Sequence, residues 1–132
     1  MFDETGRVWI TSAIRDPEKS PAFCTDPANR YAKFFPLAAP SGSLRQVSVY
    51  NPGTGRFDLI DTCFGTHHLQ FGHDAGRTLY LSGDTQAIGW VDTRTFDRTG
   101  NAESAIGWCP MVLDTNGDGR IGEWTNPGEP DD

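Results

Sequence analysis

The sequence predicts an all-β fold, and three observations carry this prediction. Gly and Pro are frequent, with 15 and 9 residues among 132, while 36% of the residues are hydrophobic and 11% are aromatic, which is typical of a turn-rich globular chain. Short runs of β-branched and aromatic residues alternate with turns that contain Gly, Pro and Asp. No segment between Met1 and Leu113 has the period of about 3.6 residues that marks an amphipathic helix.

The expected strands follow one another in short steps, with one interruption. The first strand leaves a turn at 3–6, and a proline-rich insertion then runs over about 16–45 without a regular period. Strands resume around the turn Asn51-Pro52-Gly53-Thr54-Gly55, whose residues favour a hairpin. The expected strands are 6–12, 46–50, 56–60, 67–71, 78–82 and 86–91, and a turn at 92–95 closes the last of them.

Two phrases of the sequence recur. The phrase GRVWITS at 6–12 returns as GRTLYLS at 76–82, and VSVYNPGT at 47–54 returns loosely as IGWVDTRT at 88–95. The second pair has the spacing of a β-propeller blade, a four-stranded antiparallel sheet that recurs every 40 to 45 residues or so. The sequence therefore predicts a partial β-propeller over 1–113, with about two full blades and part of a third. Chance similarity between strand-turn phrases is the alternative.

The motifs of this repeat resemble those of one propeller family, the streptogramin (virginiamycin B) lyases, whose propellers have seven blades. The resemblance covers about 3–113, and the phrase DTCFGTHHL at 61–69 is similar to a bacterial branch of such proteins. The motifs that carry it are Ile88-Gly89-Trp90-Val91-Asp92, Asn51-Pro52-Gly53-Thr54-Gly55, Asp74-Ala75-Gly76 and Val8-Trp9-Ile10-Thr11.

This resemblance implies that the chain is a piece of a longer protein. A propeller closes only with at least about four blades, because each blade buries its faces against its neighbours. The remaining blades of the parent chain are then the expected partner. The start of the sequence shows no signal peptide, which we attribute to truncation, and we expect an exported protein, periplasmic or extracellular.

The charge of the chain argues against two classes of partner. With 11 Lys and Arg against 18 Asp and Glu, the formal net charge is −7. Nucleic acids and anionic membranes attract basic surfaces, so neither is an expected partner. No apolar run approaches the roughly 20 residues that a membrane-spanning helix needs.

The three cysteines lack the CxxC spacing of zinc and redox sites. Their spacing alone leaves two possibilities, three free thiols or one disulfide with one free thiol. Cys24 lies in the proline-rich insertion and Cys63 follows the hairpin after it, so a bridge between them would restrain a long loop. We expect Cys24 and Cys63 to pair and Cys109 to remain free.

Two adjacent histidines are the candidate catalytic residues. In a strand His67 and His68 face opposite ways, which makes them a poor chelate for one metal ion. The resemblance implies a catalytic histidine near the start of an inner strand, a position that matches His68, with His67 as its rival. A packing or hydrogen-bonding role in the channel is the alternative.

Two functions follow from these features. The first is an exported β-propeller that binds a small molecule, sugar or peptide at its channel mouth. The second is a lyase of the streptogramin type, in which a histidine acts as general base and Mg²⁺ polarises an ester carbonyl during elimination. Motifs of hydrolases, zinc proteases, NTPases and dinucleotide-binding proteins are absent from the sequence. Whether the protein is an enzyme stays open.

An acidic segment at 114–132 follows the partial propeller. Residues 114–123 supply oxygen ligands at positions 1, 3 and 5 of a calcium loop and a Gly at position 6, but position 12 is Thr125 and not Glu. The pattern predicts a free-standing Ca²⁺ loop, and a solvated turn without metal is the alternative. The expected metal ligands are Asp114, Asn116, Asp118, Arg120 and Glu123.

We predict that Ca²⁺ binds this loop in the micromolar to millimolar range, because its ligand set is incomplete. Mg²⁺ is expected to bind more weakly, since its strict octahedron tolerates a loose loop poorly. Calorimetry should detect Ca²⁺ binding to the wild type and a loss of binding in Asp118→Ala. The absence of a Ca²⁺ heat from the wild type at millimolar concentration would leave the segment as an acidic turn.

Overall fold

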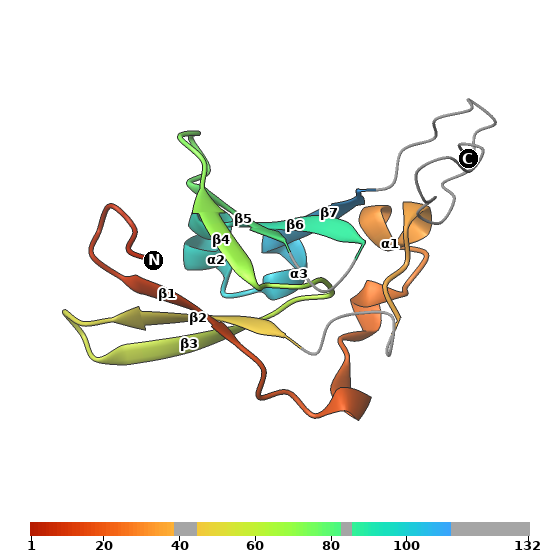
Figure 1. The fold of residues 1–132 in the computed structure, drawn as a ribbon, viewed down its shortest axis with the longest axis horizontal. Helices are drawn as coiled ribbons and strands as arrows, with labels where there is room; N and C mark the ends of the chain where they lie inside the picture. The colour runs from red at the N-terminus through yellow and green to blue at the C-terminus, as the bar shows by residue number, and fades with distance from the viewer. Residues whose placement is uncertain (39–44, 83–85, 112–132) are drawn as a thin grey trace, which may run out of the picture.

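Two antiparallel sheets make up most of the regular structure. The computed structural model describes residues 1–38, 45–82 and 86–111 (Figure 1). In each sheet, strands that are neighbours in sequence are hydrogen-bonded neighbours. The all-β prediction is therefore confirmed. Sheet A contains β1 (Val8–Ser12), β2 (Gln46–Asn51) and β3 (Arg56–Asp61), and sheet B contains β4 (His68–Phe71), β5 (Thr78–Ser82), β6 (Ala87–Asp92) and β7 (Ile106–Pro110).

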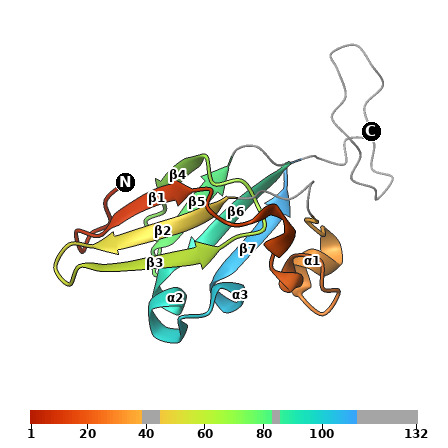
Figure 2. The same cartoon turned by 90° about the horizontal axis from the view of Figure 1, so that it is seen from below.

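The core lies between the two sheets, which are stacked as two layers (Figures 1 and 2). We call the face of each sheet that is turned toward the other sheet its inner face. Along β5, Leu79 and Leu81 are buried on the inner face, while Tyr80 points outward. Phe64, from the connection between the sheets, lies against Gly89, where an added Cβ would stand 2.1 Å from its ring. This close approach explains a glycine in the middle of β6.

Three short α-helices lie in the described connections, whereas the sequence predicts none. They are α1 (Arg30–Phe34), α2 (Thr93–Thr99) and α3 (Ala102–Ala105), and the 3-10 turns Pro17–Lys19 and Ala22–Cys24 precede α1. The turn expected at 92–95 is the start of α2, where the Asp92 carboxylate accepts a 2.8 Å hydrogen bond from the Thr95 N–H. Gly100 ends α2 with a φ of 62°. Capping residues specify helices this short, which have too few turns to show a hydrophobic period. No helix in the described ranges is long and apolar enough to cross a membrane.

Strand β7 is not among the strands expected from the sequence. Its residues Gly107 and Pro110 are poor strand formers, although Ile106 and Trp108 are buried. A Cβ at Gly107 would lie 2.5 Å from the ring of Trp90. The glycine thus lets an aromatic ring lie across the strand, a tertiary requirement that local strand propensity does not reveal.

The predicted disulfide fixes the proline-rich insertion to the sheets. Cys24 and Cys63 are bonded, with their Cα atoms 5.4 Å apart, and both side chains are buried. The bridge joins the insertion to the segment that follows β3. Cys109 is a free and exposed thiol, so both parts of the cysteine prediction are confirmed.

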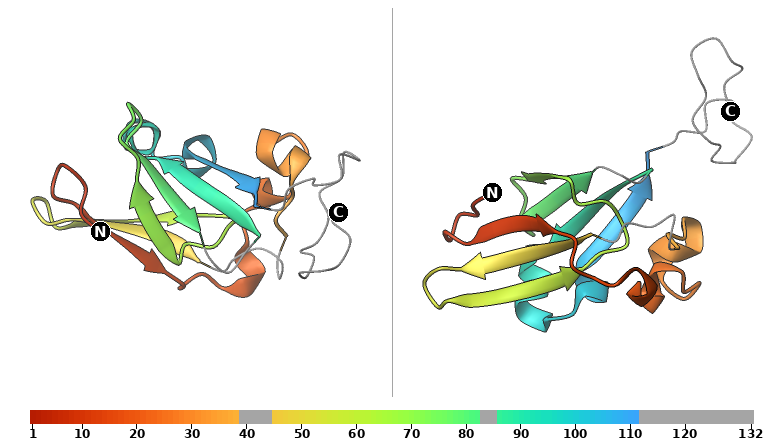
Figure 3. Two further views of the ribbon diagram at one scale, coloured as in Figure 1. Left: turned by 45° about the horizontal axis from the view of Figure 1, so that its top comes forward. Right: turned by 60° about the horizontal axis from the view of Figure 1, so that its bottom comes forward.

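Aromatic contacts hold the second half of the insertion, where α1 lies beside β7 (Figure 3). The ring of Tyr31 contacts the rings of Trp90 and Trp108, with centroid distances of 5.4 Å in both cases. The Trp108 Nε1–H donates a hydrogen bond of 2.7 Å to the Phe35 carbonyl. The described part of the insertion therefore covers one edge of sheet B through α1.

Both sheets are antiparallel meanders, with three strands in sheet A and four in sheet B. Trp9 lies opposite Val49 in sheet A, and Tyr80 lies opposite Trp90 in sheet B. In the phrase match of 47–54 with 88–95, Val49 corresponds to Trp90. Because Trp9 pairs with Val49 and Tyr80 pairs with Trp90, Trp9 then corresponds to Tyr80. The match of 6–12 with 76–82 places Trp9 on Leu79 instead, one residue away from this register.

The turns that precede β1 and β5 have the same hydrogen bond. The Asp3 carboxylate accepts from the Arg7 backbone N–H at 3.0 Å, and the Asp74 carboxylate accepts from the Thr78 N–H at 2.8 Å. In both turns the acceptor lies four residues before the donor. This shared geometry supports the equivalence of the two strands.

Equivalent residues of the two sheets lie on opposite faces with respect to the core. Trp9 is 0% exposed on the inner face of sheet A, whereas Tyr80 is 43% exposed on the outer face of sheet B. Conversely, Ile10 is exposed and its equivalent Leu81 is buried. In this register the two inner faces carry residues that are not equivalent, so the sheets pack front to back.

Removing the disulfide is expected to lower the free energy of unfolding by about 3 to 4 kcal/mol, because the unfolded chain regains the entropy of a long loop. Guanidinium unfolding of the wild type with and without reductant, and of Cys63→Ser, measures this loss. Cys109→Ser is the control and should unfold like the wild type, since its thiol is exposed. Equal stability of the oxidised and reduced protein would contradict the prediction.

Candidate functional site

The two predicted catalytic histidines lie together at the start of β4. His68 is the first residue of the strand, and His67 directly precedes it. The Nδ1 atom of His67 and the Nε2 atom of His68 are 3.1 Å apart, and the ring centroids are 4.5 Å apart. One ring nitrogen must donate and the other accept, so this hydrogen bond needs at least one neutral imidazole.

This contact differs from the geometry expected of adjacent strand residues. Side chains alternate between faces only inside a strand, and His67 lies just outside β4. Its backbone is therefore free to turn its ring toward His68. The expectation that the two imidazoles point apart is wrong, and with it the argument that adjacency alone prevents them from binding one ligand.

His68 lines a hollow of about 400 Å³ on the outer face of sheet B. Cross-strand pairing builds it, because Gln70 lies opposite Tyr80 and His68 lies opposite Ser82. The outward side chains offer an imidazole, an amide, a phenol and a hydroxyl, all of which can form hydrogen bonds to a polar ligand. The lining residues are His68, Leu69, Gln70, Tyr80, Leu81, Ser82 and Ile88.

The sequence does not single out Gln70, Tyr80, Ser82 or Ile88 as site residues. They belong to three strands, and only the pairing register brings them beside His68. The signal that could have found them is the alternation of the strands, which places outward residues of neighbouring strands in rows. Using it requires the register, which the sequence left uncertain by one residue.

The predicted calcium loop cannot be compared with the structure. Its residues Asp114, Asn116, Asp118, Arg120 and Glu123 lie outside the described residues. Within 1–38, 45–82 and 86–111, no group of three or more His, Cys, Asp or Glu side chains is placed to hold a metal ion. The Ca²⁺ assignment therefore remains a proposal from the sequence.

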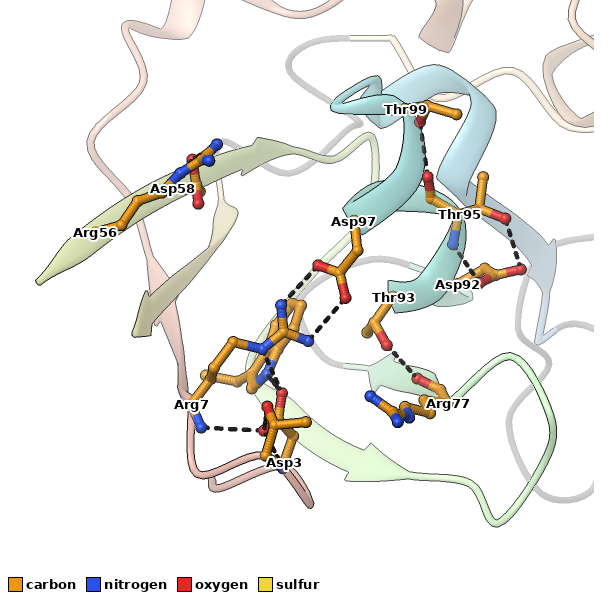
Figure 4. A network of polar contacts seen from close by, with 12 residues as sticks. Asp3, Arg7, Arg56, Asp58, Arg77, Asp92, Thr93, Thr95, Asp97 and Thr99 are labelled. Carbon is orange, nitrogen blue, oxygen red and sulfur yellow. Dashed lines mark hydrogen bonds and ion pairs between the residues drawn. The ribbon is translucent and has the colours of Figure 1, made fainter. Parts of the chain in front are cut away.

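A network of charged groups joins the turn before β1 to α2 (Figure 4). The Arg7 guanidinium donates to Asp3 at 2.7 Å and to Asp97 at 2.6 Å. The Asp3 carboxylate also accepts 2.9 Å hydrogen bonds from the Trp9 Nε1–H and the Thr5 N–H. The network therefore connects a buried tryptophan of sheet A to the helix that follows β6.

The surroundings of Asp3 determine its charge state. Burial raises the pKa of this carboxyl, but the hydrogen bonds from Trp9, Thr5 and Arg7 outweigh burial and hold the pKa well below its usual range. Burial likewise lowers the pKa of Arg7, and its bonds to Asp97 and Asp3 outweigh this and raise it. Both groups are therefore charged over the whole physiological range.

A second hollow, of about 160 Å³, lies beside this network. Its lining includes Arg7, Arg56, Asp58 and Asp97. Arg7 pairs with Asp97, and Arg56 pairs with Asp58 at 2.8 Å (Figure 4). Because each of these charges already has an oppositely charged partner, the hollow is better explained as part of the fold than as a binding site.

Comparisons with known proteins do not extend this description. No family model matches the chain, and no curated protein and no solved structure is significantly similar to it.

We predict that Asp3 makes stability depend on pH. Its folded-state pKa is depressed, so its contribution is present above the unfolded value of about 4 and is lost as the pH falls below it. Asp3→Asn is expected to lower the free energy of unfolding by about 1 to 3 kcal/mol at pH 7, with a shallower loss between pH 5 and 2. Urea unfolding across this range measures both effects. The exposed Asp16→Asn is the control, and a parallel pH profile for Asp3→Asn and wild type would refute the role.

Proposed function

We propose that this chain belongs to an exported, propeller-type binding protein, and that a small molecule, sugar or peptide binds in the hollow beside His68. The observation that carries the proposal is the gathering of His68, Gln70, Tyr80 and Ser82 around one hollow. These groups combine hydrogen-bonding atoms with an aromatic ring, as sites for small polar ligands do.

The arrangement of the sheets supports the propeller part of the proposal. Both sheets are antiparallel meanders, and equivalent residues such as Trp9 and Tyr80 lie on opposite faces with respect to the core. Front-to-back stacking of meander sheets is the packing that successive propeller blades require. Further blades would cover the exposed outer face of sheet A, and they are the proposed partners of these two sheets.

The disulfide supports export. Cys24 and Cys63 are both buried and bonded, and they close a loop across the insertion. Structural disulfides persist in the periplasm and outside the cell, whereas cytosolic thiols are kept reduced. We therefore place the protein in the periplasm or outside the cell.

The ligand proposal is tested by screening monosaccharides and dipeptides for binding by NMR, with the histidine ring signals as reporters. A ligand of the hollow should shift the His68 signals, and His68→Ala or Gln70→Ala should weaken its binding at least tenfold, or about 1.4 kcal/mol. His73→Ala is the matched control, because His73 lies in the turn after β4 and outside the hollow. Binding that both hollow variants leave unchanged would refute the site.

An elimination enzyme is the second candidate, and the contact between the two imidazoles favours it. An imidazole whose ring nitrogen meets a second imidazole at 3.1 Å has a partner that can take up or return a proton. In this function Mg²⁺ would polarise the ester carbonyl of the substrate. Incubation of a streptogramin lactone with the protein and Mg²⁺, followed by chromatography for the ring-opened isomer, separates this candidate from simple binding.

A further inference from the structure

The outer face of sheet A carries exposed hydrophobic side chains on all three of its strands, whereas Ser12, Gln46 and Asp61 make one end of it polar. Tyr50 lies directly opposite Phe57, and Ile10 and Leu59 lie on either side of Ser48. These four hydrophobic side chains are exposed, with Phe57 at 56%. A contiguous apolar group of this kind on a sheet face indicates a contact surface.

The outer face of sheet B is apolar in a matching place. Tyr80 and Ile88 are exposed, and Trp90 beside them is half-buried under the ring of Tyr31 from α1. In the repeat register these residues are equivalent to Trp9, Val47 and Val49, which fill the inner face of sheet A. This surface therefore corresponds to a face that is already buried elsewhere in the molecule.

The same correspondence holds in the other direction. The outward residues Ile10, Tyr50 and Leu59 of sheet A are equivalent to Leu81, Val91 and Trp108, which form the inner face of sheet B. The outer face of sheet B thus corresponds to the inner face of sheet A, and the outer face of sheet A corresponds to the inner face of sheet B. The two inner faces already pack together in the core.

One aromatic pair shows what a second contact would look like. Phe2 pairs with Val8 and Phe71 pairs with Leu79, so Phe2 is the counterpart of Phe71. In the core, Trp9 meets Phe71 edge-on with centroids 5.9 Å apart. Phe2 is 71% exposed and has no such partner ring among the described residues.

We propose that copies of this chain, where no further blades cover them, associate head to tail, with the outer face of sheet A of one copy stacked on the outer face of sheet B of the next. The stack repeats the contact between the sheets within one copy, and Tyr80 of one copy meets Phe2 of the next as Trp9 meets Phe71. Such a contact uses two different faces and does not close at two copies, so it produces a concentration-dependent series of oligomers.

The stack does not rest on the proposed ligand site. It shares Tyr80 and Ile88 with the hollow, while His68 and Gln70 lie on the edge strand β4. Sheet A is three-stranded and its strands correspond to β5, β6 and β7, so β4 lies at the margin of the stack. Association is therefore measured without ligand, and it can fail or succeed independently of ligand binding.

The test is sedimentation velocity of the disulfide-bonded chain from about 5 to 500 µM, at 0.15 M salt to screen the net charge of −7. The wild type is expected to form dimers and larger species as the concentration rises. Phe57→Lys removes the sheet A surface and Tyr80→Lys removes the sheet B surface, and each variant alone should associate at least tenfold more weakly. Phe34→Lys is the matched control, because Phe34 is exposed on α1 and belongs to neither sheet.

Mixing the two variants gives the decisive result. Phe57→Lys keeps an intact sheet B surface and Tyr80→Lys keeps an intact sheet A surface, so an equimolar mixture should form one-to-one dimers and nothing larger. A wild type that stays monomeric, a single variant that associates as strongly as the wild type, or a mixture that associates no better than either variant alone would each overturn the proposal. If circular dichroism shows that either variant is unfolded, Leu59→Lys and Ile88→Lys replace the two substitutions on the same faces.

Discussion

The burial of Trp9 between the two sheets is the interaction on which the rest of the structure depends. Its ring meets Phe71 of sheet B edge-on, and its indole N–H donates to the Asp3 carboxylate at 2.9 Å. Asp3 also binds Arg7, whose guanidinium reaches Asp97 of α2. One aromatic side chain thus fills the core, satisfies its polar atom, and orders the charged groups that join the start of sheet A to the helix after β6.

A covalent and aromatic anchor acts at the other end of β1. The insertion leaves the sheet there and is tied to the segment after β3 by the bond between Cys24 and Cys63. It then places Tyr31 against Trp90 and Trp108, over the glycine of β7 that leaves room for these rings. The described part of the insertion has only one short α-helix and two 3-10 turns, and it is therefore held mainly by tertiary contacts.

The alternation of side chains along the strands creates the surfaces that can act on other molecules. Alternate side chains of each strand point into the core. The others point outward and leave Tyr80 and Phe57 exposed on the two opposite outer faces. At the start of β4, the same alternation turns His68 and Gln70 outward, where they line a hollow together with the ring of Tyr80. The proposed ligand binding and the proposed association with further sheets thus depend on one feature, the outward side chains of strands whose inward side chains are already packed.

The sequence by itself determined the strand-forming segments, the hairpin turn and the pairing of Cys24 with Cys63, because strand propensity, turn chemistry and loop entropy act locally or through chain length. The sequence did not predict helix α2, which its capping residue specifies, or strand β7, in which Gly107 leaves room for the ring of Trp90. Only the tertiary structure decided that Trp9 corresponds to Tyr80 and that His67 meets His68 at a hollow. The physical reason is that strand register fixes which face every side chain occupies, and register is set by pairing with distant segments.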